Sequence, residues 1–496
     1  MSMHYTTKQK VEQVKEKLLA AIDVGKRSLH VKYMDYTRKV HNRKAYRFDN
    51  SSKGFEDLID CTKKMCDSLG LEEAVFGMEA TGHYWQNLAV HLEILGYTVV
   101  TVNQNHTKKV EEIVDGSQRK DDDKDPEGIG ILMALGDWSP YYRPEGDYAE
   151  IRKAYRLLEW CTEDTTRYTN KLHGYLDKHL PGYEPCFGKE KGVTGALSLA
   201  VLKKAALPED IINLGAEGII NIWKEAGLRG TKNRAEKIVS AVSGNKGYAI
   251  TDGSQTCRLE LACIVRELEL AIRTEKEAEE QVRKIVARIP GAQRLLGIKG
   301  ISYRTVAGFF AIVGDLKKRF SNVKQIVKLA GLNIVIRSSG TYKGEARISK
   351  RGCPELRAAL YRVLTALLEN TPAFKPLRDH FMKRTDNPLN AIKANVAMCN
   401  KLLRIFYAMV IHDEDYDEKK MLGDIKRMER TKVSQAAVEA GKLKNELDMI
   451  LYGAKGKEVT NEMIESIRKV GKAMKGLVAV AERGTVKETL PQAVGG

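Results

Sequence analysis

The sequence from Ala330 to Leu360 reads Ala-Gly-Leu-Asn-Ile-Val-Ile-Arg-Ser-Ser-Gly-Thr-Tyr-Lys-Gly-Glu-Ala-Arg-Ile-Ser-Lys-Arg-Gly-Cys-Pro-Glu-Leu-Arg-Ala-Ala-Leu. Its apolar run predicts a short strand that delivers Ser338 and Ser339 onto a turn at Gly340. A serine beside glycine has little bulk around its oxygen, which can approach a phosphorus atom, and basic side chains would neutralise the phosphate oxygens. These side chains are Arg337, Lys343, Arg347, Lys350, Arg351 and Arg357. On local chemistry alone, a hairpin turn with a solvated cationic face is the more economical interpretation.

The whole chain is strongly basic. Its 496 residues include 82 Lys and Arg against 65 Asp and Glu, which gives a formal net charge of +17 at pH 7. The charge is spread along most of the chain, which favours a polyanionic partner, nucleic acid first among these. No apolar run approaches the ~20 residues of a membrane-spanning helix, and the N-terminus lacks the apolar core of a signal peptide. We therefore expect a soluble, intracellular protein with no membrane partner.

Residues 15–140 alternate between strand and helix patterns, which predicts an α/β domain. Strands are expected at 18–25, 29–34, 46–48, 74–80 and 97–102, and helices at 55–69 and 85–95. Asp23 lies near the end of the first strand and Glu79 near the end of the fourth. Because an unpaired carboxylate in a core costs several kcal/mol, we expect Asp23 at a strand end with a cation or metal nearby.

A further group of acids lies in Lys120-Asp-Asp-Asp-Lys-Asp-Pro126. Asp122 and Asp125 are three residues apart, so on the first turn of a helix they would share one face. Phosphoryl chemistry with two divalent ions needs carboxylates from different elements around ions ~4 Å apart, and Asp23, Glu79, Asp122 and Asp125 would fit that need. A solvated acidic loop, with Glu79 as a capping residue, is an equally good interpretation of these residues alone.

Residues 145–288 carry two apolar seams at coiled-coil spacing. One runs from Ile151 to Tyr175 and the other from Cys257 to Ile285. Their similar length, about four heptads each, predicts an antiparallel coiled coil or a pairing between subunits. Residues 181–250 would form a compact helical cap at one end. We expect this part to position other domains rather than to perform chemistry.

Residues 289–411 predict a mainly helical C-terminal domain around the opening stretch, with helices at 305–313, 320–329 and 353–368. The turn Gly297-Ile-Lys-Gly-Ile301 is similar to a helix-hairpin-helix turn, which would bring Lys299 and backbone N–H groups to a DNA phosphate. A glycine turn between packed helices would look the same without DNA. Residues 412–496 begin with an acidic run and predict a polar helical extension.

The acids lie in blocks that carry a specific resemblance. Asp23-Val-Gly, Glu79-Ala-Thr-Gly-His-Tyr-Trp85, the run 92–103 and Lys120-x-Asp-x-x-Asp125 resemble the N-terminal RuvC-like (RNase H-like) domain of the insertion-sequence one-ten family of transposases. The resemblance assigns that family's catalytic, metal-binding Asp-Glu-Asp-Asp tetrad to Asp23, Glu79, Asp122 and Asp125. This chain has Asp121 where the family tends to have Thr, and Pro126 where it tends to have Ala. Asp121 or Asp123 therefore remains an alternative to Asp122.

Residues 289–410 resemble the serine transposase domain of the same family. The matching blocks are Ala330-Gly-Leu332, Ser338-Ser-Gly340, Ile348-Ser-Lys-Arg-Gly352 and Leu356-Arg357. The family's nucleophilic serine directly precedes glycine, which assigns that role to Ser339. The proline that usually follows Gly-Leu by one residue is absent at Asn333-Ile334. Together the two resemblances cover most of residues 15–410.

The resemblance implies an enzyme, a bridge-RNA-guided recombinase in the prokaryotic cytoplasm, associated with the nucleoid. It implies Mg2+ on the tetrad, two ions with Mn2+ as an alternative, and a covalent link between Ser339 and DNA. The implied partners are a guide RNA, donor and target DNA, and further copies of the chain in a homodimer that assembles to a tetramer. Two other functions stay open here: a Holliday-junction-type nuclease that uses the acids and water, and a nucleic-acid-binding protein without catalysis.

Overall fold

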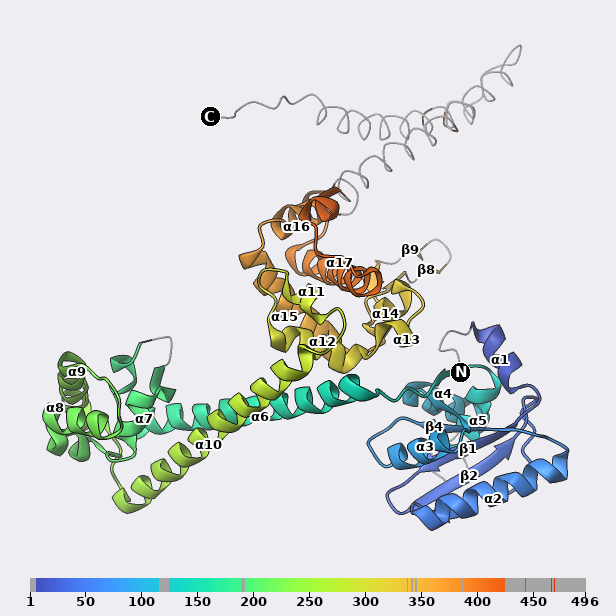
Figure 1. The fold of residues 1–496 in the computed structure, drawn as a ribbon, viewed down its shortest axis with the longest axis horizontal. Helices are drawn as coiled ribbons and strands as arrows, with labels where there is room; N and C mark the ends of the chain where they lie inside the picture. The colour runs from blue at the N-terminus through green and yellow to red at the C-terminus, as the bar shows by residue number, and fades with distance from the viewer. Residues whose placement is uncertain are drawn as a thin grey trace. The chain divides into compact units, whose positions relative to one another are not determined.

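The computed structural model describes residues 6–115, 125–188, 192–336, 338–339, 342–343, 346–384 and 388–423, together with Lys442, Glu465 and Arg468. At 111–115, 338–339 and 342–343 the description is of the backbone alone. The chain divides into two compact units (Figure 1). One comprises Met1–Ala149 and Gly314–Ile326, and the other comprises Glu150–Val313 and Val327–Gly496. The finer division into four domains stays a prediction.

The first unit is built on a six-stranded mixed sheet with the order β3-β2-β1-β4-β5-β6. The central strand, β1, pairs antiparallel with β2 and parallel with β4. Beyond them, β5 is parallel to β4, and β6 closes that edge antiparallel to β5. The strands are β1 (Leu18–Val24), β2 (Ser28–Met34), β3 (Tyr46–Asp49), β4 (Ala74–Glu79), β5 (Thr98–Val102) and β6 (Trp138–Pro140). This sheet agrees with the α/β class predicted for the N-terminal part.

Side chains of β1 alternate between two cores, one on each face of the sheet. Leu18, Ala20 and Ile22 pack with residues of α2 and α3, whereas Leu19 and Ala21 pack with residues of α5. Because both faces are covered, this central strand is a continuous apolar run rather than an alternating one. The helices of the unit are α1 (Thr7–Val14), α2 (Ser52–Leu69), α3 (Trp85–Ile94), α4 (Gln104–Asp115), α5 (Asp125–Ala134) and α13 (Leu316–Arg319).

Local signals in the sequence explain where these elements begin and end. Ser51 caps α2 by accepting the N–H of Gly54, and Gly70 ends that helix in the left-handed conformation, with φ of 66°. The expected strands and the helices at 55–69 and 85–95 are all present. The structure adds α4 and β6, for which we made no prediction. A three-residue strand such as β6 is too short to show periodicity.

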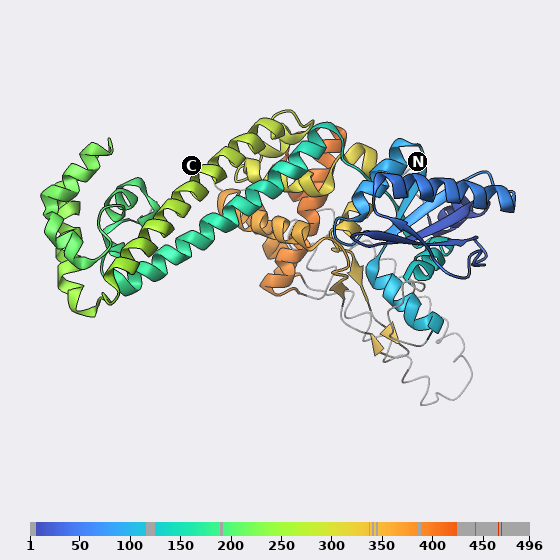
Figure 2. The same cartoon turned by 90° about the horizontal axis from the view of Figure 1, so that it is seen from below.

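Two long helices, α6 (Gly146–His179) and α10 (Ser254–Val286), run side by side (Figure 2). Near one end, Tyr175 donates its hydroxyl to the carbonyl of Cys257 at 3.1 Å. Further along, the Thr162 hydroxyl donates to the carboxylate of Glu275 at 2.7 Å. Residue numbers thus fall along one helix as they rise along the other, so the pair is antiparallel and formed within one chain. Its coiled-coil character stays a prediction.

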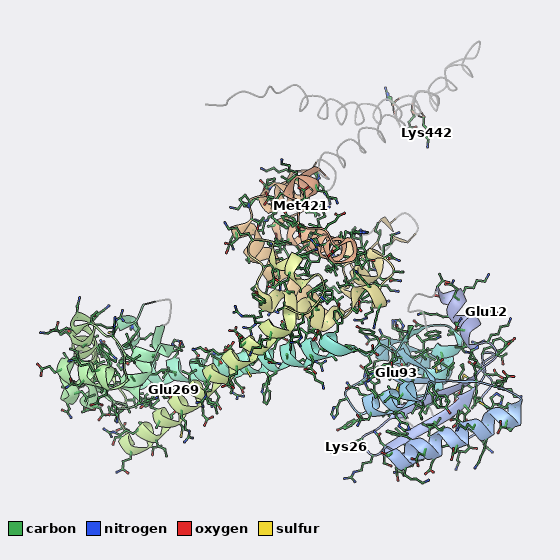
Figure 3. The ribbon with its side chains drawn as sticks, in the orientation of Figure 1. Glu12, Lys26, Glu93, Glu269, Met421 and Lys442 are labelled. Atoms are coloured by element: carbon green, nitrogen blue, oxygen red, sulfur yellow. The ribbon has the colours of Figure 1, made fainter. Side chains whose placement is uncertain are left out.

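The region predicted as a helical cap contains α7 (Ala196–Leu202), α8 (Pro208–Glu225) and α9 (Lys232–Asn245), with 3-10 turns at Glu184–Cys186, Gly192–Thr194 and Lys246–Tyr248. Trp223 of α8 is 1% exposed, and its indole N–H donates to the carbonyl of Leu197 at 2.8 Å. Glu269 of α10, labelled in Figure 3, pairs with Lys203 at 2.7 Å. The first contact joins α8 to α7 within the cap, and the second links the cap to α10.

In the rest of the second unit, α11 (Ala292–Leu296), α15 (Pro354–Asn370) and α16 (Phe374–Lys383) pack against α17 (Ala391–His412). Phe406 of α17 lies edge-on to Phe309 of α12, with ring centroids 5.3 Å apart. Arg304, also on α12, pairs with Glu275 of α10 at 3.5 Å and donates to the Thr162 hydroxyl of α6. The other elements are α12 (Tyr303–Val313), α14 (Val323–Leu329), β7 (Ile334–Val335), β8 (Ser338–Ser339), β9 (Tyr342–Lys343) and β10 (Arg347–Ile348).

The helix expected at 320–329 is present as α14 (Val323–Leu329), which begins three residues later than predicted. Phe320 has an extended backbone with φ of −131° and ends the preceding short helix, α13. Asn322 accepts the N–H of Lys324 at 3.0 Å, which marks the start of α14.

One described helix, α17, is long and apolar enough to cross a membrane when judged by length and composition alone. We had expected no run that approached this length. Its inner face, which includes Ala394, Leu402 and Phe406, is buried in the helical unit. Core helices of globular proteins pass the same test, and the packing of α17 accounts for its composition.

Two helix glycines give a matched test of the packing between α12 and α6. A Cβ at Gly308 would lie 2.8 Å from the ring of Tyr155, which is 8% exposed and donates its hydroxyl to Glu159, whereas a Cβ at Gly174 would meet open space. We expect Gly308→Ala to cost roughly 1–3 kcal/mol through overpacking. Gly174→Ala should add about 1 kcal/mol of stability through helix propensity. Calorimetric Tm values of the two variants should therefore move in opposite directions, and a Tm rise for both would contradict the close packing.

Candidate active site

Parallel pairing of β1 with β4 places Asp23 beside Glu79. The register aligns Ile22 with Met78, so the two acids that follow stand at adjacent strand ends. Each acid lies two residues beyond a position packed against α5, Ala21 on β1 and Gly77 on β4. Since side chains alternate along a strand, both carboxylates belong to the sheet face that α5 covers. Adjacent strands are ~4.8 Å apart, which puts the acids within reach of one ion.

The surroundings of the two carboxylates are polar and partly open. Asp23 and Glu79 are both half-buried. The Thr81 hydroxyl donates to the Glu79 carboxylate. On the other side of β1, His30 of β2 stands directly opposite Asp23. His30 was missed from the sequence, because only its pairing opposite Asp23 places the two side chains on one face of the sheet.

Asp125 begins α5, which packs against β1, β2 and β4. Helix α5 can approach β4 closely because the strand has glycine where the two meet. A Cβ on Gly77 would lie 2.1 Å from the sulfur of Met133 on α5. Near the start of the helix, Glu127 pairs with Lys32 of β2 at 3.6 Å. The helix that carries Asp125 is thus anchored on the acid-bearing half of the sheet. Asp122 lies outside the described residues, as do its alternatives Asp121 and Asp123.

The chemistry of these donors suits a hard divalent cation. Within the part of the chain that the structure describes, no group of three or more His, Cys, Asp or Glu side chains is arranged to hold a metal. Mg2+ keeps several waters and is commonly bound through one or two carboxylates and the phosphates of its substrate. The adjacent carboxylates of Asp23 and Glu79 therefore fit Mg2+, or Mn2+, better than a metal that needs a complete protein cage.

The serine pair lies in a two-part hairpin, residues 334–348, which we call the serine arm. At its base β7 pairs with β10, aligning Ile334 with Ile348. Toward its tip β8 pairs with β9, aligning Ser338 with Lys343 and Ser339 with Tyr342. The backbone register therefore makes Ser339 the last paired residue of β8. The turn predicted at Gly340 lies outside the described residues. The side chains of Ser338, Ser339 and Lys343 lie outside the description, as do Arg337 and Gly340 entirely.

Hydrogen bonds hold the base of the serine arm in place. The Ser349 hydroxyl bonds to the side chain of Asn333 at 2.5 Å, and its backbone N–H donates to the Asn333 carbonyl at 2.8 Å. Asn400 of α17 donates to the carbonyl of Leu332 at 3.2 Å. Arg357 of α15 donates through Nη1 to the carbonyl of Ala330 at 3.0 Å. The base of the arm is thus fixed to two helices, α15 and α17.

The predicted nucleic-acid-binding cations differ in their surroundings. Arg347, Lys350 and Arg351 are exposed around the base of the arm, and Lys299 is exposed on its own glycine turn. Lys350 has φ of 55°, an uncommon backbone conformation outside glycine. Arg357 is half-buried, and its bond to Ala330 shows a structural use for one guanidinium nitrogen. A role for each of these cations in nucleic-acid binding stays a prediction.

Cys353 is a second potential nucleophile near the arm. Burial, together with the nearby Glu355 carboxylate that accepts a bond from the thiol at 3.0 Å, raises the pKa of Cys353 to about 11. A thiol with such a pKa stays protonated at neutral pH and is a weak nucleophile. The cysteine therefore does not compete with serine for this role.

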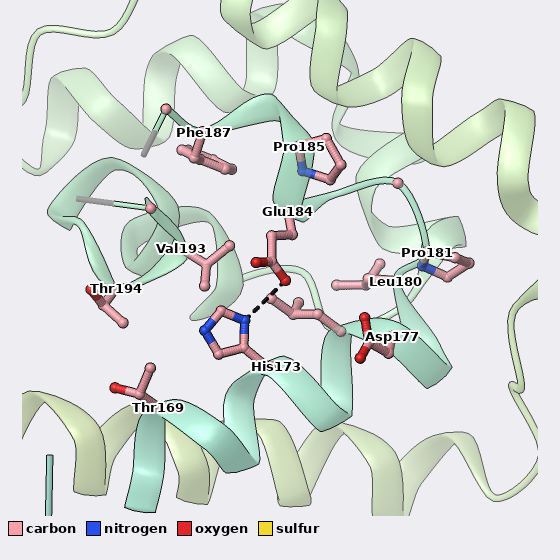
Figure 4. Close-up of a pocket in the computed structure, with 14 residues that line it drawn as sticks. Thr169, His173, Asp177, Leu180, Pro181, Glu184, Pro185, Phe187, Val193 and Thr194 are labelled. Atoms are coloured by element: carbon pink, nitrogen blue, oxygen red, sulfur yellow. Dashed lines mark hydrogen bonds and ion pairs between the residues drawn. The ribbon is translucent and has the colours of Figure 1, made fainter. Parts of the chain in front are cut away.

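A cavity of about 720 Å3 opens at the cap end of α6 (Figure 4). His173 Nδ1 lies 2.9 Å from a carboxylate oxygen of Glu184 across it, and Asp177 lines it as well. No lysine or arginine is among the described residues that line this cavity. The described lining thus contains two carboxylates, those of Asp177 and Glu184.

Comparison with known proteins agrees with the order of the two sites along the chain. Residues 20–181 match a family model described as a transposase, of the DEDD type found in IS110. Residues 292–377 match a model described as the transposase of the IS116/IS110/IS902 family. The transposase for insertion sequence element IS1111A of Coxiella burnetii (strain RSA 493 / Nine Mile phase I) is 28% identical over 156 residues. That match covers 32% of this chain and 43% of the relative, less than half of its length.

The first family model spans the carboxylate-bearing sheet, and the second spans the serine arm and its base. Both models name IS110 transposases, and the relative from Coxiella is also described as an insertion-sequence transposase. The chain therefore belongs to the IS110 family of transposases.

Proposed function

We propose that this protein is an RNA-guided DNA recombinase that moves an insertion sequence. The observation that carries the proposal is the adjacent placement of Asp23 and Glu79 on the face covered by α5, the helix that begins with Asp125. The sheet order, with β2 antiparallel between β3 and β1, supports a RuvC-like (RNase H-like) fold for the first unit. Membership of the IS110 family supports the reaction class.

Asp23, Glu79 and Asp125, with Asp122 or one of its neighbours, would hold the Mg2+ ions. When bound, the metal polarises the scissile phosphate and lowers the energy of its developing charge. The partial exposure of Asp23 and Glu79 lets a DNA backbone approach these carboxylates. Exposed Arg347 and Lys350 would contribute positive charge beside the serine arm.

Ser339 would supply the nucleophile. Its Oγ forms a bond to phosphorus, the bond from phosphorus to one bridging sugar oxygen breaks, and the freed oxygen takes up a proton as the serine proton leaves to solvent. The product is a phosphoserine link between protein and DNA, which a sugar hydroxyl of another strand reverses to complete strand exchange. In this proposal the carboxylates of the first unit and the serine of the second form one composite site, contributed by different subunits of a dimer or tetramer.

The strongly basic charge of the chain is compatible with a mechanism in which a guide RNA, rather than the protein, recognises the DNA sequence. A net charge of +17 favours contacts to phosphates, which carry no sequence information. Base pairing between a bridge RNA and the donor and target DNA would then select the sites. The protein would hold the backbones and perform the chemistry.

Removal of either strand-end acid should abolish recombination while the fold persists. We expect Asp23→Ala and Glu79→Ala to lower the rate on the order of 100-fold or more, because these carboxylates stabilise charge that develops in the reaction. The matched control is Glu73→Ala, which removes an exposed acid from the opposite end of β4, where it pairs with Lys17. Recombination is measured with guide RNA, Mg2+ and labelled DNA. A wild-type rate in Asp23→Ala would move the metal site elsewhere.

Single substitutions of Ser338 and Ser339 should show which of the two serines is the nucleophile. Ser339→Ala should remove the covalent protein–DNA adduct yet change stability by less than about 0.5 kcal/mol, because one hydroxyl near a turn contributes little to folding. Ser338→Ala should retain the adduct. Denaturing gels of labelled DNA measure protein-linked label directly. An adduct that survives in both variants would exclude the serine arm, and free nicks without any adduct would favour a water-using nuclease.

Salt should weaken nucleic-acid binding steeply. Neutralised phosphates release counterions, so we expect affinity for RNA to fall roughly 1,000-fold or more between 50 and 200 mM salt if six or more phosphates are contacted. Filter binding across a salt series gives the slope. Site-specific DNA capture by RNA-free protein would argue against RNA guidance.

A further inference from the structure

Asn50 joins two loops of the first unit through its side-chain amide. It lies in the short turn between β3 and α2. Its Nδ2 donates to the carbonyl of Gly25 at 2.9 Å and to the carbonyl of Tyr84 at 3.3 Å. These carbonyls belong to different parts of the chain: Gly25 follows β1, and Tyr84 precedes α3.

Both loops begin at the acids of the candidate active site. Gly25 comes two residues after Asp23, and Tyr84 comes five residues after Glu79. The strand register ends at Ile22 and Met78, so regular β1–β4 pairing does not extend past the acids. Beyond that point, the amide of Asn50 is a direct bridge between the two loop backbones.

The chemistry of this bridge specifies asparagine. A primary amide nitrogen carries two hydrogens, and here each has a carbonyl partner. An aspartate of the same shape has no hydrogen to donate when ionised, and it would place negative charge against both carbonyls. Alanine would leave the loops without a link.

The backbone around Asn50 is itself fixed. The N–H of Asn50 donates to the carbonyl of Arg27 at 3.0 Å, which ties it to the β1–β2 hairpin. On its other side, Ser51 caps α2 by accepting the N–H of Gly54 at 3.2 Å. A Cβ on Gly54 would lie 1.9 Å from the Asp49 carbonyl, so only glycine permits this tight turn onto the helix. The amide is therefore held in place before it meets the two loops.

We propose that Asn50 is a positioning residue that sets the spacing between Asp23 and Glu79, and through it the affinity of this site for a divalent cation. The inference rests on the proposed function, because it assumes that these carboxylates hold Mg2+. Asn50 does not touch the metal or the DNA in this assignment. It acts through the backbones of the two loops that carry on from the acids.

The test measures metal binding directly. Free Mn2+ is followed by electron paramagnetic resonance as it is titrated into wild-type protein and into Asp23→Ala, Asn50→Ala, Ser51→Ala and Asn42→Ala. Loss of a group that orients metal ligands typically weakens metal binding 10- to 100-fold, so we expect the Mn2+ Kd of Asn50→Ala to rise about tenfold or more.

Two of these variants are matched controls. Ser51→Ala removes the neighbouring cap and costs stability, but it leaves the Asn50 amide intact. Asn42 makes the same type of bridge, with Nδ2 donating at 2.9 Å to the carbonyls of Val31 and Lys44, away from the acids. Both controls should keep the wild-type Kd, whatever their effect on Tm.

The possible outcomes distinguish a failure of the positioning role of Asn50 from a failure of the proposed metal site. If Asp23→Ala loses Mn2+ while Asn50→Ala binds as the wild type does, the metal site stands and the positioning role is wrong. Equal weakening in Asn50→Ala and Ser51→Ala would also overturn it, since general destabilisation would explain both. If Asp23→Ala binds Mn2+ as tightly as the wild type, the metal site itself is misplaced and the role of Asn50 falls with it.

Discussion

Parallel pairing between β1 and β4 is the constraint on which the first unit depends. These two strands are covered on both faces, with Ile22 and Met78 in one core and Ala21 and Val75 in the other. A carboxylate within such a strand would lose its hydration without a partner, at a cost of several kcal/mol. Acids are tolerated only where the strands leave the core, which is where Asp23 and Glu79 lie. The same pairing that buries the apolar residues therefore brings two charged groups together at one edge. Stability and the candidate chemistry have a common origin in this register.

In the second unit, a polar network around Glu275 sets how the helices are aligned, although most of the contacts around it are apolar. Glu275 falls within the apolar seam of α10, where it accepts a bond from Thr162 of α6 and pairs with Arg304 of α12. Shifting α10 by one turn would separate Glu275 from both partners and leave polar groups poorly satisfied. A polar residue in a helix seam is known to fix register in this way. The network also joins the C-terminal helices to the long helix pair, so the base of the serine arm stands on a framework fixed at this crossing.

Sequence alone predicted the features that depend on local or periodic signals. The positions of Asp23 and Glu79 at strand ends followed from the cost of burying charge, and the inner faces of α6 and α10 followed from their spacing. Features that depend on distant partners were not visible. Arg357 looked like one more cation beside the serines, yet its guanidinium donates to the Ala330 carbonyl. Asn50 carried no signal at all, because the carbonyls of Gly25 and Tyr84 come together only in the folded sheet. The start of α14 at Val323 rather than Phe320 was missed, because apolar residues indicate which face is buried and not where a helix begins.

Division of the chain between two units bears on how the proposed reaction is controlled. The carboxylates belong to the first unit and the serine arm to the second. A serine hydroxyl needs a base or a strongly polarised target, and Glu355, an acid near the described base of the arm, already accepts a bond from Cys353. The first unit, in turn, offers carboxylates for metal without a serine arm of its own. Under the proposed function, neither unit can cleave DNA until the two are assembled into one site. Assembly would depend on a guide RNA that pairs with both DNA sites. Under that proposal, such an arrangement would keep a strongly basic protein from cutting DNA that it contacts only through phosphates.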